Sequence, residues 1–185
     1  MKLNPNRTWQ LVEKKLADER DPLRRRNLEL VLAHMKAEAR ADIEGVVATL
    51  TSKPRYITYA ALDQPILNPS GSRDAVHAFY DATIVQTGAH RLEFACDRVI
   101  VDEDSVFTEG TMRMAYPGTT LAAMGITVDD PDAYYVAESR MAVVWPVDPG
   151  EEKLTGEEVY SAGDPFEGIA ERKIALEDIA AVGPA

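Results

Sequence analysis

The first candidate for chemistry in this chain is His34. A histidine can donate a hydrogen bond or move a proton near neutral pH. Glu38 follows four positions later, so a helix would place the two side chains one turn apart on the same face. His34 can therefore serve a site, or it can be a surface or boundary histidine paired with Glu38, and both interpretations stay open.

Other signatures of known chemistry do not occur in the sequence. It has no glycine-rich phosphate loop and no nucleophile elbow. Its three histidines have no partners at metal-ligand spacing, and His34 with Glu38 would supply only two ligands. We expect neither a metal nor a cofactor. The only cysteine, Cys96, lies in an apolar run and is expected to be a buried thiol.

Two segments with strand composition alternate between two faces. Over residues 105–116, Glu109 and Arg113 share one face, and Met112 and Met114 share the other. If Glu109 and Arg113 point inward, they form a pocket ion pair, and Glu109 becomes a candidate catalytic residue. If they point outward, they form a solvated or dimer-facing pair, which we favour. The segment 134–147 presents a face typical of a core or a pocket wall, with Tyr135, Ser139, Met141, Val143 and Trp145.

The elements that would position these residues fall into two groups along the chain. Amphipathic spacing and capping residues predict helices over 8–20, from Asp21-Pro22 onward, over 42–50 and over 72–85. Strands are predicted over 55–59, 92–101, 105–116, 134–147 and 153–161. Helices followed by an antiparallel meander are typical of an α+β domain. We expect a helical arm over 1–22, the main domain over 23–176 and a frayed tail over 177–185.

Two stretches of this pattern resemble the nuclear transport factor 2-like superfamily. One is ADIEGVVATL at 41–50, similar to the short second helix of that group after its acidic cap. The other is GSRDAVHAFY at 71–80, similar to the opening of its next helix. With the strand order, the resemblance covers roughly residues 23–165. It implies a cone in which a curved mixed or antiparallel sheet wraps around helices and encloses a largely apolar pocket.

The resemblance also suggests roles for individual residues. His34 lies eight positions before Asp42, as the catalytic tyrosine of ketosteroid isomerase lies before its acidic cap. With one extra residue near Pro54, Tyr59 matches the catalytic aspartate of that enzyme. A phenol is a poor base at pH 7 but a good hydrogen-bond donor, so the steroid isomerisation is not implied. Asp63 could supply the missing carboxylate, or it could be a turn residue.

The paired Arg and Asp of limonene epoxide hydrolase match Gly110 and Met112 here, so epoxide hydrolysis is not implied either. The substrate-binding residues that we expect around the pocket are Tyr56, Asp63, Phe79, Met112, Met114 and Trp145.

Composition restricts the partners. The chain has 31 acidic and 20 basic residues, and its net charge of −11 repels nucleic acid and anionic membranes. No apolar stretch approaches membrane-spanning length, and residues 1–7 lack the apolar segment of a secretion signal. We therefore expect a cytoplasmic protein.

These observations lead to two hypotheses for function. The first is a SnoaL-like protein that binds an apolar or aromatic small molecule and performs cofactor-free acid–base chemistry such as isomerisation, dehydration or cyclisation. The alternative is a non-catalytic small-molecule-binding or dimeric assembly protein with the same fold. We expect a homodimer through the outer face of the sheet, because both faces of 134–147 are too apolar to meet water. A monomer is expected instead if the 8–20 helix or the tail after Glu167 covers that face.

Overall fold

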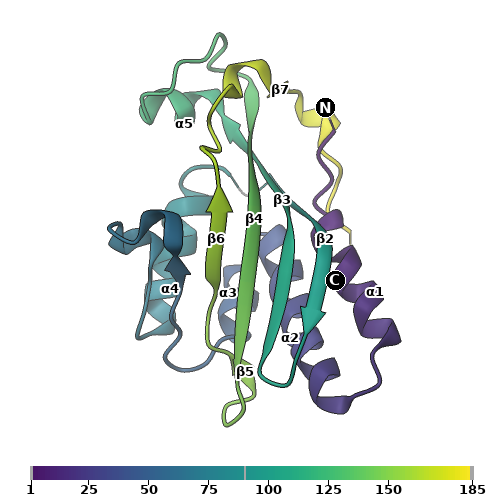
Figure 1. Ribbon diagram of the computed structural model, residues 1–185. Helices are drawn as coiled ribbons and strands as arrows, with labels where there is room; N and C mark the ends of the chain where they lie inside the picture. Colours follow the sequence, from purple (N-terminus) through teal and green to yellow (C-terminus); the bar gives the residue numbers. More distant parts are fainter. Residues whose placement is uncertain (1, 90, 184–185) are drawn as a thin grey trace.

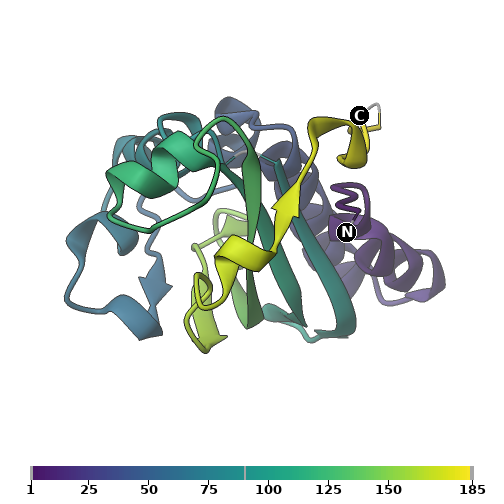
Figure 2. The same ribbon diagram turned by 90° about the horizontal axis from the view of Figure 1, so that it is seen from above.

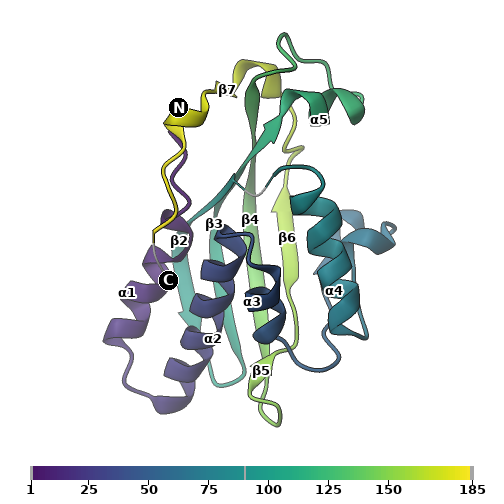
Figure 3. The same cartoon turned by 180° about the vertical axis from the view of Figure 1, so that it is seen from behind.

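The computed structural model describes residues 2–89 and 91–183, which form a layer of helices against one curved sheet (Figure 1). Seen from behind, the helices cover one face of the sheet, whereas the other face has no helix over its middle (Figure 3). The helices are α1 (Arg7–Asp18), α2 (Pro22–Ala39), α3 (Ile43–Ala48), α4 (Arg73–Tyr80) and the short α5 (Gly118–Ala123). No helix in the described ranges combines the length and the apolar composition needed to cross a bilayer.

Polar caps explain where the inner helices begin. Asp21, Asp42 and Ser72 each accept a hydrogen bond from a backbone N–H group in the first turn of the helix that follows. Such caps satisfy N–H groups that have no partner inside the helix. The starts predicted at Asp21-Pro22 and Asp42 are thus confirmed.

The sheet contains seven strands of mixed orientation. Its main path runs β1 (Ile57–Thr58), β6 (Glu158–Ala162), β4 (Tyr134–Asp148), β3 (Ser105–Pro117) and β2 (Arg91–Val101); β5 (Lys153–Leu154) and β7 (Lys173–Ile174) also pair with β4. Only the β1–β6 pair is parallel among the pairings of these strands. The sheet is curved and not closed, which confirms the predicted α+β cone.

Three predicted elements differ in extent. The segment 153–161 forms two strands, because Gly156 has φ +139° and a Cβ there would collide with the carbonyl oxygen of Arg55. The strand predicted over 55–59 contains only β1. The helix predicted over 72–85 is α4 followed by a π-helical turn, Asp81–Val85.

The inward face of β3 carries the apolar set. Val106, Met112 and Met114 pack against the main core, together with Trp145 of β4. Glu109 and Arg113 therefore point outward, as favoured from the sequence. Glu109 accepts a hydrogen bond from Arg140 at 2.7 Å on that outer face.

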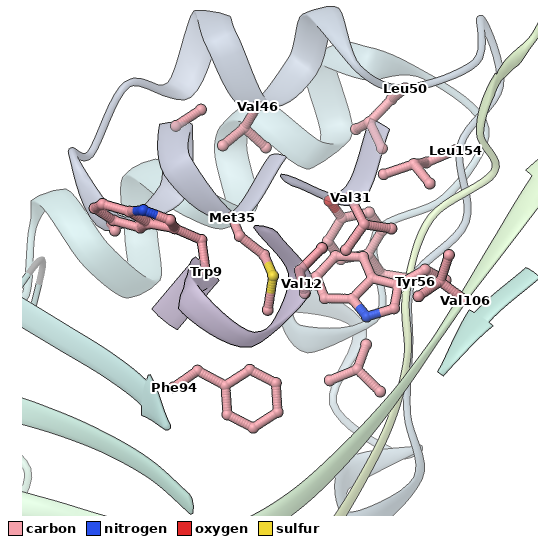
Figure 4. Close-up of a cluster of buried hydrophobic side chains, with 14 of the residues drawn as sticks. Trp9, Val12, Val31, Met35, Val46, Leu50, Tyr56, Phe94, Val106 and Leu154 are labelled. Carbon is pink, nitrogen blue, oxygen red and sulfur yellow. The ribbon is translucent and has the colours of Figure 1, made fainter. Parts of the chain in front are cut away.

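The core joins both layers and includes the first helix (Figure 4). Trp9 and Val12 of α1 are buried with Met35 of α2 and Phe94 of β2. Helix α1 is therefore packed into the core of the domain rather than extending from it as a separate arm.

The two ends of the chain meet beside the sheet. Figure 2 shows the C-terminal segment crossing the end of the sheet toward the N-terminus. Leu3 donates to the carbonyl of Asp178 at 3.1 Å and accepts from the N–H of Ala180 at 2.9 Å. The tail expected to fray over 177–185 is thus paired through its described part, which ends at residue 183. Leu3 and Ile174 pack on Val136 and so cover this end of the outer face of the sheet.

A buried carboxylate on β2 binds the N-terminal segment to the sheet. The Glu93 side chain is fully buried and accepts from the Asn4 N–H at 2.6 Å, from Arg113 at 3.1 Å and from Arg7 at 3.2 Å. Removing one partner of a buried ion pair leaves the charge of the other buried and unpaired. We predict that Glu93→Ala lowers the free energy of unfolding by about 3 kcal/mol, measured by urea denaturation.

Glu13→Ala is the matched control, because Glu13 pairs with Lys36 at the surface. It should cost less than about 1 kcal/mol. Equal losses in the two variants would contradict the role given to Glu93.

Candidate functional site

His34 lies at the centre of a buried polar cluster. Its side chain is fully buried on α2. Nδ1 is 2.7 Å from the hydroxyl of Thr49, and Nε2 is 3.1 Å from Oε1 of Glu157 and 3.3 Å from the hydroxyl of Tyr80. The interpretation of His34 as a surface histidine paired with Glu38 is therefore wrong.

Two phenols complete the cluster. Tyr80, the last residue of α4, donates its hydroxyl proton to Oε1 of Glu157 at 2.9 Å. The hydroxyl of Tyr56 is 3.4 Å from that of Tyr80 and 3.5 Å from Nε2 of His34. An aromatic ring flanks these groups, since Trp145 and His34 pack in a T-shaped arrangement with ring centroids 5.3 Å apart.

Irregular backbone brings the distant members together. Glu157 directly precedes β6 and follows Gly156, whose positive φ lets the chain pass close to Arg55. The carbonyl of Glu157 accepts from the N–H of Ile57, so the segment that carries Tyr56 lies beside it. The starts of β1 and β6 are therefore hydrogen-bonded to each other next to Tyr56 and Glu157, the two residues that contribute to the cluster.

Burial controls the charge of these groups. Desolvation, and then the charge of Glu157, raise the pKa of Tyr80 and of Tyr56 well above the ordinary value for a phenol. Both phenols remain neutral hydrogen-bond donors over the physiological range. Glu38, one turn after His34, has its pKa raised to about 8 by burial and then by the charge of Glu157. Its side chain is partly exposed, unlike that of His34.

Comparisons with known proteins agree on the architecture. No protein-family model matches the chain, and no curated protein sequence is similar to it. Solved structures do match. A candidate SnoaL-like polyketide cyclase from Shewanella putrefaciens superposes with a TM-score of 0.63 at 10% identity, over 88% of this chain and 92% of that one. The chain has the nuclear transport factor 2-like fold.

Two further structures with this fold contain ligands. TerC co-crystallised with polyporic acid has a TM-score of 0.56 and 18% identity, over 79% of this chain and 98% of its own. A Mycobacterium tuberculosis protein in complex with estradiol-17beta-hemisuccinate has a TM-score of 0.55 and 16% identity, over 73% and 92%. At such identities the likeness establishes the nuclear transport factor 2-like fold and leaves the reaction open.

Within this fold, part of the predicted site comes together. Tyr56 belongs to the cluster, and Phe79 packs on it, with ring centroids 5.7 Å from Tyr56 and 4.9 Å from Tyr80. Trp145 contacts His34. Met112 and Met114 lie on the inner face of β3, packed against the core.

Three predicted site residues lie elsewhere. Tyr59 is 41% exposed and stacks on Tyr160, because the chain leaves β1 in a 3-10 turn that places its ring outside the sheet. Asp63 is exposed in the following loop. Glu109 lies on the outer face, with Arg140 and Arg98. The structure thus brings none of the three to His34.

Tyr80, Glu157 and Thr49 were not among the predicted site residues. Tyr80 offered a signal, since it lies on the same inner helix face as Phe79. An acidic residue directly after a glycine gives no such signal for Glu157, which is 123 positions from His34. Thr49 lies one position before the end of the predicted 42–50 helix, where it is an ordinary polar residue.

The cluster is closed to solvent in this conformation. Surface hollows of 250 to 470 Å³, for example between Tyr134 and Leu176, are lined by other residues. In the described part of the chain, no three His, Cys, Asp or Glu side chains gather as a metal site would need. The polar groups of the cluster therefore bind one another.

The raised pKa of Glu38 predicts a pH-dependent stability. A carboxyl whose pKa is higher in the folded state favours folding below its unfolded pKa of 4.5, and this contribution is lost as pH rises toward about 8. Glu38→Gln keeps the neutral form, so it should match wild type near pH 5 and exceed it by about 1–2 kcal/mol near pH 9. Urea midpoints at both pH values measure this difference.

The exposed Glu44 provides the control, because Glu44→Gln should change stability little at either pH. A Glu38→Gln protein with the wild-type pH profile would show that Glu38 ionises normally.

Proposed function

We propose that this protein binds an aromatic small molecule at the inner side of its cone, and that His34 and Glu157 move a proton on that molecule without a cofactor. The observation that carries the proposal is the convergence of an imidazole, a carboxyl group and two phenols from separate elements in a buried aromatic setting. Such groups are rarely buried together unless they are hydrogen-bonded or functional.

The cluster has the components for a proton shift. Tyr80 and Tyr56 are neutral donors that can bind a carbonyl or phenol oxygen of the ligand. His34 and Glu157 can then take a proton from one atom and return it to another. Isomerisation, dehydration and cyclisation are the reactions that need only this exchange, in agreement with the SnoaL-like structures that the fold resembles.

Entry of a ligand requires the two phenols to move. Tyr80 lies where α4 widens into the π-helical turn Asp81–Val85, and such turns are frequent at functional sites. Tyr56 precedes a strand of only two residues. Both side chains can therefore rotate without breaking the long strands β3 and β4.

Binding of aromatic probes tests the proposal. Polyporic acid and estradiol-17beta-hemisuccinate, ligands of the neighbouring structures, are suitable probes. We predict binding detectable by calorimetry, and an affinity about tenfold lower in Tyr80→Phe and in His34→Gln, because each loses about one hydrogen bond. Native mass spectrometry of the purified protein should also show an aromatic ligand.

Tyr59→Phe is the matched control, since Tyr59 lies outside the cluster, and it should bind as wild type. Binding that is insensitive to Tyr80 and His34 would contradict the proposed site.

A non-catalytic role is the second candidate. It is favoured by the fact that the polar groups of the cluster pair with one another, as in a structural core. In that case a ligand would be held and released unchanged. Recovery of the co-purified molecule with and without prolonged incubation at neutral pH distinguishes the two roles.

We further propose a cytoplasmic homodimer through the outer face of the sheet. Ile100 and Tyr160 are 54% and 44% exposed there, with Phe107 and Val144 between them. Light scattering at micromolar concentration should give about twice the chain mass of 20.4 kDa, and Phe107→Asp should give a monomer, because it places a charge in the apolar face. Leu62→Asp, in a separate exposed loop, should remain dimeric. A wild-type mass near that of one chain would overturn the dimer.

A further inference from the structure

The hydroxyl of Thr49 has two neighbours and only one hydrogen. It is 2.6 Å from the carbonyl oxygen of Val46 and 2.7 Å from Nδ1 of His34. A carbonyl oxygen can only accept, so the hydroxyl hydrogen must point at Val46. The oxygen of Thr49 then presents a lone pair to His34, and Nδ1 must supply the proton of that contact.

We propose that Thr49 is a positioning residue that holds His34 with its proton on Nδ1, so that Nε2 and the Glu157 carboxyl share a second proton. The inference deepens the proposed function, and it rests on that function for its catalytic meaning. The tautomer itself follows from hydrogen-bond directions alone.

The shared proton is required by the other side of the ring. In a neutral imidazole with its proton on Nδ1, Nε2 is an acceptor. It faces Oε1 of Glu157 at 3.1 Å, and an ionised carboxylate is also an acceptor. Two acceptors at this distance repel each other unless one proton lies between them. The site therefore holds either an imidazolium with a carboxylate or an imidazole with a carboxylic acid.

No neighbouring group replaces that proton. Tyr80 already donates to Glu157, and Tyr56 is 3.5 Å from Nε2, too far for a strong bond. The indole N–H of Trp145 donates to Thr108 at 2.9 Å, so it is engaged elsewhere. From α2 itself, Glu38 follows His34 by one turn, and burial raises the pKa of its carboxyl to about 8.

Thr49 is held firmly enough to select one tautomer. Its backbone N–H bonds to the carbonyl of Val46 at the end of α3, and its carbonyl accepts from Leu154 of β5 at 3.0 Å. Its exposure is 7%. These bonds fix the position of the residue, and its hydroxyl hydrogen is directed by the Val46 carbonyl at 2.6 Å. Water has little access to replace the hydroxyl.

Nitrogen NMR of the histidine ring tests the assignment without any ligand. In ¹⁵N-histidine-labelled protein, the signals of His34 are identified by their loss in His34→Gln. We expect a proton-bearing Nδ1 in wild type, together with a proton on, or shared with, Nε2. In Thr49→Val no acceptor faces Nδ1, so the ring should change to the neutral form with its proton on Nε2 alone. Thr49→Ser keeps the hydroxyl and should retain the wild-type signals.

Two results would overturn the proposal. One is a wild-type Nδ1 without a proton, which can be read even if Thr49→Val does not fold. The other is a folded Thr49→Val protein with unchanged ring signals. The proposed function fails separately, if the protein with the expected tautomer binds no aromatic probe. Where a probe does bind and turn over, Thr49→Val should change the pH profile of the reaction, and Thr49→Ser should restore it.

Discussion

The complete burial of His34 is the constraint on which the inner half of the molecule depends. A buried polar group without a partner costs about 1–3 kcal/mol, so both ring nitrogens must be hydrogen-bonded. Their partners come from three places far apart in the chain: Thr49 at the end of α3, Tyr80 at the end of α4 and Glu157 before β6. A one-residue shift of Thr49 would leave Nδ1 without this partner, whereas Nε2 is paired by both Tyr80 and Glu157.

The same burial decides which protonation states the interior can hold. Tyr56 and Tyr80 stay as phenols because their pKa values are raised by desolvation. Burial raises the pKa of Glu38 to about 8, so this carboxyl is largely uncharged at neutral pH. A second uncompensated carboxylate would be costly in these surroundings. The interior therefore avoids a second negative charge beside the His34–Glu157 pair.

The sequence predicted the order of the elements well because caps and alternation are local signals. The helix start at Asp21-Pro22 and the long strands β2, β3 and β4 follow from residues close in the chain. The site was harder to predict. Tyr56 and Tyr59 are three positions apart in a segment expected to be one strand, where alternation already places them on opposite faces. In the structure β1 ends before Tyr59, which lies outward in a 3-10 turn.

Glu157 shows the physical limit of such predictions. Its role depends on a contact with His34 that spans 123 positions, and on the backbone of Gly156 passing Arg55. Neither condition leaves a periodic pattern in the sequence. The orientation of β3 was open for a similar reason, since both of its faces mix polar and apolar residues, and the core packing of Met112 and Met114 decides it.

The hydrogen bonds of the closed cluster also restrict what can bind there. A molecule that displaces Tyr80 takes a donor away from Glu157 and a close neighbour away from His34. A wholly apolar ligand offers no replacement, so its binding would leave buried polar atoms unpaired. A ligand of this cluster would therefore need at least one hydrogen-bonding atom that reaches the His34–Glu157 pair, and an aromatic body would suit Phe79 and Trp145. This requirement is stricter than that of an apolar pocket, and it arises from the buried histidine rather than from the fold.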